Sequence, residues 1–178
     1  RYLIHMAQIV ALGEVDALVP ERIFAELNKA LGEPAPSAFF ETLRSCGALA
    51  RIFPEIDALF NVPQSFRHEP NCSVGTHTLM VLDQAAILSP EPRVRYAALL
   101  HDIGRGEISS TKWSHYPRSH ARALALVQAI SQRIRAPVSF QRLAERVARY
   151  HAHAHRAFSL SSGAIVDLLQ RIDAFRQT

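Results

Sequence analysis

Apolar residues recur every three or four positions along most of this 178-residue chain, which is the spacing of an amphipathic helix. The segment from Glu21 to Leu31 shows the pattern clearly, because Pro20 and Gly32 stand at its ends and these residue types commonly open and close helices. Alternating apolar and polar runs joined by hairpin turns, the pattern of a sheet, are missing. The sequence therefore predicts an all-α fold.

A polar segment from Val62 to Asn71 interrupts this helical pattern. It contains two prolines and no apolar periodicity, which favours a boundary or a long loop. We therefore expect a small helical body segment over residues 1–61, followed by a helical bundle over residues 62–178.

Composition excludes several classes of protein. With 48% hydrophobic and 20% charged residues, the chain is too apolar for a disordered protein. No apolar run approaches the ~20 residues of a membrane-spanning helix, and the first residues, Arg1 to His5, lack the basic-then-apolar layout of a secretory signal. Cys46 and Cys72 are isolated, so that neither a disulfide framework nor a zinc site made of cysteine pairs is available. We expect a soluble, cytoplasmic protein without membrane contact.

Positive charge is concentrated in the C-terminal part of the chain. Residues 1–102 carry 12 acidic and 8 basic side chains, whereas residues 103–178 carry 4 acidic and 12 basic ones. Arginine supplies 18 of the 20 basic residues, and its planar fork suits phosphate groups. Two interpretations stay open at this point: an anionic partner, or a genome rich in arginine codons.

Two histidines and two carboxylates stand at the edges of apolar helical faces. His77 lies in the first turn of a predicted apolar helix, and His101 with Asp102 ends the next predicted helix. Asp173 borders a stripe of apolar residues near the C-terminus. Because an uncompensated buried charge costs several kcal/mol, a divalent cation that satisfies all four side chains is one interpretation. Ordinary hydrogen-bonded core residues are the other.

Further basic residues follow these candidates. Arg105 lies in the glycine-flanked turn after Asp102 and is placed to meet a phosphate, with Lys112 and His115 on the adjoining segment. His120 and His151 are candidates to contact a substrate phosphate, to donate a proton or to bind a second metal ion. For each of these residues a solvated side chain without a role is the alternative, and we favour that interpretation for His153 and His155. Arg142, Arg146 and Arg149 form one helical stripe that suits an RNA backbone, or a solvated face.

The candidate metal ligands resemble a known motif. The segments Gly75-Thr-His77-Thr and Leu99-Leu-His101-Asp102-Ile-Gly-Arg105-Gly, with a late helical Asp173, are similar to the HD superfamily of metal-dependent phosphohydrolases. From about Met6 onward the chain also resembles the C-terminal part of bacterial CCA-adding tRNA nucleotidyltransferases that carry an HD domain. This second resemblance rests on Gly13-Glu-Val-Asp-Ala-Leu-Val-Pro-Glu-Arg22, Phe40-Glu-Thr-Leu-Arg-Ser-Cys-Gly-Ala-Leu49 and Phe53-Pro-Glu-Ile-Asp-Ala-Leu-Phe60.

The resemblance implies a fold, a metal and an activity. The fold would be an HD-domain helical bundle behind a small helical body, and the four metal ligands would be His77, His101, Asp102 and Asp173. The metal would be nickel, magnesium or another transition metal, and imidazole ligands favour the transition metals. The implied activities are 2′,3′-cyclic phosphodiesterase, 2′-nucleotidase and phosphatase.

Roles and partners follow from the same resemblance. We expect His101, Asp102 and Arg105 to act in catalysis, and His120, His151 and Lys112 to bind substrate. The partner would be tRNA or a nucleotide 2′,3′-cyclic phosphate, and the protein a monomer or homodimer.

Three departures from the family pattern keep alternatives open. The histidines at His115 and His120 lack the glycines of the family's His-Gly-His stretch, and Ala152 stands where the family has Asp after a histidine. No Asp-x-Asp pair for nucleotide addition is present, so we expect a fragment that lacks the nucleotidyltransferase head. A catalytically vestigial HD module that binds and positions tRNA is the first alternative. Another HD specificity, such as nucleotide or alarmone hydrolysis, is the second.

Overall fold

The computed structural model describes residues 2–64, 72–106 and 117–176 of the chain. The described residues form helices and turns without a β-strand, and the predicted all-α class is confirmed. One isolated antiparallel bridge, between Pro63 and Ser73, joins the chain on either side of residues 65–71. This segment lies within the range for which the sequence predicts a boundary or a loop.

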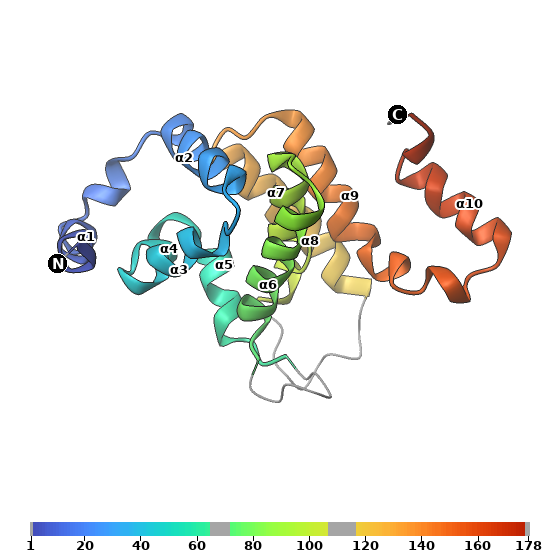
Figure 1. Ribbon diagram of the computed structural model, residues 1–178, viewed down its shortest axis with the longest axis horizontal. Coiled ribbons are helices and arrows are strands. Elements are labelled where there is room, and N and C mark those ends of the chain that lie inside the picture. The colour runs from blue at the N-terminus through green and yellow to red at the C-terminus, as the bar shows by residue number, and fades with distance from the viewer. Residues whose placement is uncertain (1, 65–71, 107–116, 177–178) are drawn as a thin grey trace.

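The N-terminal part of the chain consists of short helices (Figure 1). They are α1 (Tyr2–Ala11), η1 (Glu14–Ala17), α2 (Pro20–Gly32), α3 (Ser37–Ser45), α4 (Ala48–Ile52), α5 (Pro54–Ala58) and η2 (Leu59–Asn61). Prolines and positive-φ glycines punctuate them: Pro20 and Pro54 open helices, and Gly47, with φ 79°, separates α3 from α4.

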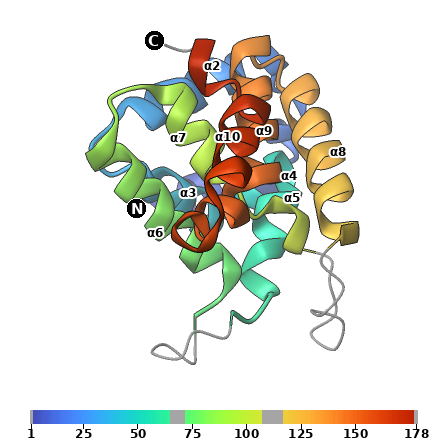
Figure 2. The ribbon, with the colours of Figure 1, turned by 90° about the vertical axis from the view of Figure 1, so that its right-hand side faces the viewer.

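The C-terminal part is built from longer helices. They are α6 (Val74–Leu88), α7 (Pro92–Leu100), η3 (Ile103–Arg105), α8 (Pro117–Arg133), α9 (Val138–Ala154), η5 (Ala157–Ser159), α10 (Ser162–Arg171) and η6 (Ala174–Arg176). Helix α7 contacts α2, α6 and α9, whereas α10 lies outside α9 (Figures 1 and 2).

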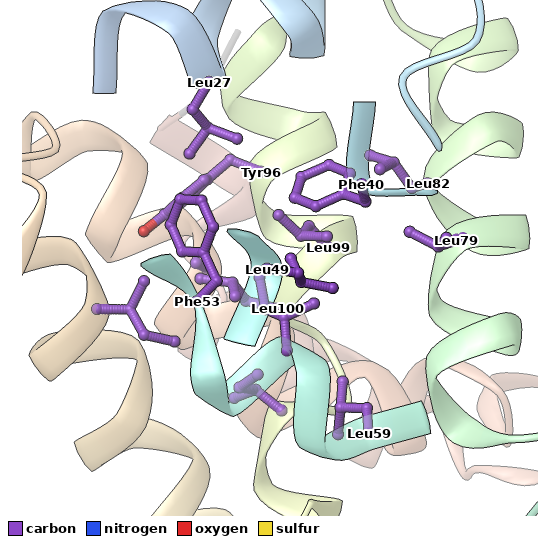
Figure 3. Close-up of a cluster of buried hydrophobic side chains, with 14 of the residues drawn as sticks. Leu27, Phe40, Leu49, Phe53, Leu59, Leu79, Leu82, Tyr96, Leu99 and Leu100 are labelled. Atoms are coloured by element: carbon purple, nitrogen blue, oxygen red, sulfur yellow. The ribbon is translucent and has the colours of Figure 1, made fainter. Parts of the chain in front are cut away.

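Helix α7 lies at the centre of the molecule. Tyr96, Leu99 and Leu100 on this helix are completely buried, and Figure 3 shows them among apolar side chains from several other helices. The sequence pattern instead favours α6 as the central helix. In the structure Met80 and Leu88 of α6 are exposed, and only one side of that helix packs inward.

The hydrophobic core joins the two parts of the chain. Leu27 of α2 and Phe40 of α3 belong to the same cluster as Leu82 of α6 and Leu99 of α7 (Figure 3). Burying each such side chain contributes about 1.5–3 kcal/mol, so the helices on both sides of the predicted boundary stabilise one another. The boundary at residues 61 and 62 itself stays a prediction.

A buried guanidinium reinforces this junction. Arg95 of α7 is only 5% exposed, and it donates hydrogen bonds to four backbone carbonyl oxygens. Two acceptors, Leu31 and Glu33, lie at the C-terminal end of α2, and the other two, Ala86 and Ser89, lie at the end of α6. Because the last carbonyls of a helix lack partners within it and carry partial negative charge, one cation satisfies two helix ends at once.

A bidentate ion pair ties α5 to α8. Arg133 donates from Nη1 to Oε1 of Glu55 at 2.6 Å and from Nη2 to Oε2 at 2.7 Å. Partial burial raises the pKa of Glu55, but the hydrogen bonds from Arg133 and the backbone outweigh it and hold this pKa below its ordinary value.

We expect Arg95→Lys to lower the free energy of unfolding by about 2–4 kcal/mol, because an ammonium group cannot reproduce the fork that reaches both helix ends. Chemical denaturation at neutral pH measures the change. Arg93→Lys is the matched control, since Arg93 lies on the same helix but is exposed and pairs only with its neighbour Glu91. Equal stability of the two variants would contradict the assigned role of Arg95.

We expect Glu55→Gln to lower the free energy of unfolding by about 1 kcal/mol at pH 7, a modest value because Arg133 remains partly exposed. Since the pKa of Glu55 is lower in the folded state, its contribution is present above the ordinary value of 4.5 and is lost as the pH falls through the folded-state value. Denaturation curves between pH 3 and 7 should therefore converge for the wild type and this variant. The exposed Glu41→Gln serves as the control and should show no such convergence.

Candidate metal centre

The start of α6 lies next to the end of α7. Ser73 caps α6, with its Oγ accepting a hydrogen bond from the backbone N–H of Thr76 at 3.1 Å. Gly75 lies directly against the ring of Phe60, and an added Cβ would lie 2.5 Å from the ring. Only glycine permits this close approach, which fixes the helical turn that carries His77.

Three potential metal ligands converge at this point. One ligand atom each from His77, His101 and Asp102 lies within 4.8 Å of the others, and no further group of this kind occurs in the described part of the chain. His101 and Asp102 are buried and His77 is half-buried. The ring centroids of His77 and His101 are 5.4 Å apart. The structure thus brings together three of the four residues that the sequence analysis proposes as metal ligands.

The two imidazoles are held in the form that binds a metal. Burial lowers the pKa of His77 and His101, and it outweighs the opposite effect of the nearby Asp102 carboxylate. The Nδ1 of His101 lies 2.7 Å from the carbonyl oxygen of Ala98, and an Nδ1–H that donates there leaves the Nε2 lone pair facing Asp102. Metal binding requires neutral imidazoles, so little proton competition is expected here.

Asp102 is the hub of the cluster. Burial raises its pKa, but groups that include His151 and Arg105 outweigh burial and hold this pKa well below its ordinary value. Arg105 donates from Nη1 to Oδ2 of Asp102 at 2.7 Å, and Nε2 of His151 lies 3.4 Å from Oδ1. The carboxylate is therefore ionised and faces cationic groups from its own turn and from α9.

His151 differs from the other two histidines in its protonation. Burial lowers its pKa, but Asp102 and backbone carbonyl groups outweigh burial and raise it. Nδ1 lies 3.1 Å from the carbonyl oxygen of Val147, so that both nitrogens of a protonated ring have an acceptor. A protonated ring at this position can donate a proton beside the ligand cluster, and the predicted contact of His151 with substrate stays a prediction.

His155 lies one turn along α9 from His151, and the two ring centroids are 6.2 Å apart. The i, i+4 spacing predicts that both imidazoles share one helical face. The side chain of His155 is exposed, and the interpretation that it has no role stays a prediction.

Asp173 is not part of the three-residue cluster. Its Oδ2 accepts a hydrogen bond from Nη2 of Arg146 at 3.1 Å, and its backbone adopts the left-handed conformation with φ 61°. Helix α10, which precedes Asp173, buries its apolar stripe only partly, whereas the sequence pattern predicts a buried stripe. The role of Asp173 as a fourth ligand stays a prediction.

The remaining predicted residues cannot be compared with the cluster. Lys112 and His115 lie outside the described residues, and so does the side chain of His120 at the start of α8. Their predicted contacts with substrate stay predictions.

Comparison with known proteins identifies the family to which the chain belongs. A model of the HD domain family matches residues 74–174, which include all four predicted metal ligands. The chain belongs to the HD domain family. HD domains bind divalent metal ions, and the cluster of His77, His101 and Asp102 fits such an ion. Residues 6–60 match a second family model, described as "Probable RNA and SrmB- binding site of polymerase A".

Full-length relatives of this HD protein carry the name "Multifunctional CCA protein". The protein from Methylococcus capsulatus is 53% identical over 176 residues, which is 98% of this chain and 41% of the relative. The protein from Nitrosococcus oceani is 52% identical over 97% of this chain and 42% of the relative, and that from Pseudomonas aeruginosa PAO1 is 44% identical over the same shares. The chain thus spans about two fifths of the length of these relatives.

A membrane-spanning segment is not found in the part of the HD protein that the structure describes, because no helix there is both long and apolar enough.

We expect the metal-free chain to bind Ni²⁺ or Mn²⁺ with one-to-one stoichiometry in isothermal titration calorimetry. Asp102→Asn should weaken the affinity at least about tenfold, because it removes the anionic ligand while preserving the shape of the side chain. His153→Ala is the control, since His153 lies on α9 but outside the cluster. Unchanged affinity in Asp102→Asn would contradict the metal centre.

Proposed function

We propose that this chain is a metal-dependent phosphohydrolase domain that acts within a CCA-adding enzyme. Its substrates would be 2′,3′-cyclic phosphates and 2′-phosphates of nucleotides or RNA ends, with phosphatase activity on related esters. The observation that carries the proposal is the convergence of one ligand atom each from His77, His101 and Asp102 within 4.8 Å, with Arg105 and His151 both next to Asp102.

The ion itself would supply one part of the chemistry. A divalent cation held by His77, His101 and Asp102 lowers the pKa of water and withdraws charge from a phosphoryl oxygen. Magnesium, nickel and other transition metals stay candidates, and the two imidazoles favour a transition metal over magnesium. We propose Asp173 as a fourth ligand. The same calorimetric titration on Asp173→Asn tests it, and unchanged affinity would exclude that role.

The protein side chains would supply the rest. Arg105 donates from Nη1 to Oδ2 of Asp102, and the positive charge of its guanidinium would offset negative charge that develops on a phosphoryl oxygen. A water oxygen would form the new bond to phosphorus and lose a proton to the solvent, while the bond to the ribose 2′ or 3′ oxygen breaks. His151, whose pKa Asp102 raises, would in its protonated form give a proton to the leaving oxygen.

Binding to tRNA would accompany hydrolysis. The match of residues 6–60 to an RNA-binding family model and the names of the relatives support tRNA as the partner of the helical body. We also propose that Lys112 and His120 contact the substrate phosphate. The expected cytoplasmic location and the monomeric or homodimeric state stay predictions.

We expect the metal-loaded chain to hydrolyse adenosine 2′,3′-cyclic monophosphate, and Asp102→Ala to lower kcat/KM at least about 100-fold, because the substitution removes a metal ligand. Product formation followed by chromatography measures the rates. His153→Ala should retain the wild-type rate. Equal activity in Asp102→Ala after confirmed metal loading would contradict the proposal, and wild-type inactivity with all tested metals would favour the vestigial tRNA-binding module.

A further inference from the structure

An apolar groove lies between α9 and the segment formed by α10 and η6. Its volume is about 410 Å³, which falls in the range of pockets for small ligands. Leu143 and Val147 contribute to one wall, and Leu168 and Ile172 to the other. These side chains come from elements far apart in sequence, so that the groove exists only in the folded protein.

The groove borders the candidate metal centre. The ring of His151 is part of its lining, and Nε2 of the same ring lies 3.4 Å from Oδ1 of Asp102. One imidazole thus separates the apolar groove from the ligand cluster. Two neighbouring sites on either side of one side chain suit two parts of one ligand, such as a phosphate and the group to which it is esterified.

The lining indicates which chemistry the groove would accept. Apart from Arg146 and His151, its side chains carry no charge, and Tyr150 adds an aromatic surface. A phosphate or a bare sugar gains little from such walls, whereas the flat face of a nucleobase gains from burial and from contact with an aromatic ring. Arg146 lies at the groove and keeps N–H donors besides the one that Asp173 accepts, suitable for a base oxygen or nitrogen.

We propose that this groove binds the nucleoside part of the substrate whose phosphate ester lies at the metal centre. The proposal rests on the proposed hydrolase function for the identity of the neighbouring phosphate. It assigns Leu143, Val147, Leu168 and Ile172 to the faces of the base. Specificity for nucleotides over other phosphate esters then arises in the groove, while the cleavage chemistry stays with the metal ligands.

Two variants and one control on the full 178-residue chain test the groove. Leu168→Glu places a charge in the groove, and Ala154→Phe fills it without adding charge. Val166→Glu adds the same charge to α10 at a position that is 47% exposed and outside the groove. Circular dichroism first establishes that all three variants retain the helical fold.

Adenosine binding gives a readout that is independent of hydrolysis. Titration of adenosine into the metal-free chain should shift the methyl NMR signals of Val147 and Ile172. The shifts should disappear in Leu168→Glu and Ala154→Phe and persist in Val166→Glu. Absence of shifts in the wild type, or equal shifts in Leu168→Glu and Val166→Glu, would overturn the proposal whether or not the chain is a hydrolase.

Hydrolysis separates this inference from the proposed function. We expect Leu168→Glu to raise KM for adenosine 2′,3′-cyclic monophosphate at least about tenfold, because a charge in an apolar pocket opposes burial of the base. The same variant should hydrolyse ethylene phosphate, a cyclic ester without a base, at the wild-type rate. Equal losses on both substrates would overturn the groove assignment, whereas adenosine binding without any hydrolysis by the wild type would refute only the hydrolase function.

Discussion

Burial of most of the second half of α7, from Arg95 to Leu100, is the constraint on which the rest of this structure depends. A buried helix must find partners for every polar group it carries, and α7 with the turn after it carries Arg95, Tyr96 and the His101-Asp102 pair. Each partner comes from a different element. Arg95 reaches the ends of α2 and α6, the hydroxyl of Tyr96 lies 2.9 Å from that of Ser131 on α8, and Asp102 faces His151 on α9. The polar groups of one helix thereby determine how its neighbours are arranged around it.

The same burial gives the candidate metal centre its chemistry. Removing His77 and His101 from water keeps their imidazoles neutral, and surrounding Asp102 with cationic groups keeps its carboxylate ionised. Burial thus keeps two imidazoles uncharged while neighbouring cations keep an adjacent carboxylate charged. At the surface, protons would compete with a metal ion for the two imidazoles, and water would screen the charge of the carboxylate. The position of the candidate metal centre at the end of a central helix therefore gives its ligands the protonation states that metal binding requires.

Sequence patterns predict much of this arrangement but not its layering. The helices were predictable because proline, glycine and three-to-four spacing are local signals, and His77, His101 and Asp102 were predictable because they stand at the edges of apolar faces. The apolar content of α6 wrongly indicated the central helix. Helix α7 takes that place. Its Arg95 can be buried because it donates hydrogen bonds to backbone carbonyl oxygens, whereas a hydropathy pattern predicts that an arginine is exposed. The sequence also did not predict that α10 is only partly buried, because its apolar stripe has the same spacing as that of a buried helix.

By itself the sequence determined the all-α class, the family motif and three of the side chains that converge on the candidate metal centre. Tertiary structure alone decided that His151 faces Asp102, that Asp173 pairs with Arg146, and that an apolar groove separates α9 from α10. The physical reason is the range of the interactions. Helix formation depends on residues three or four positions apart, whereas a carboxylate's partner and a groove's width depend on how whole helices pack, which no local pattern encodes.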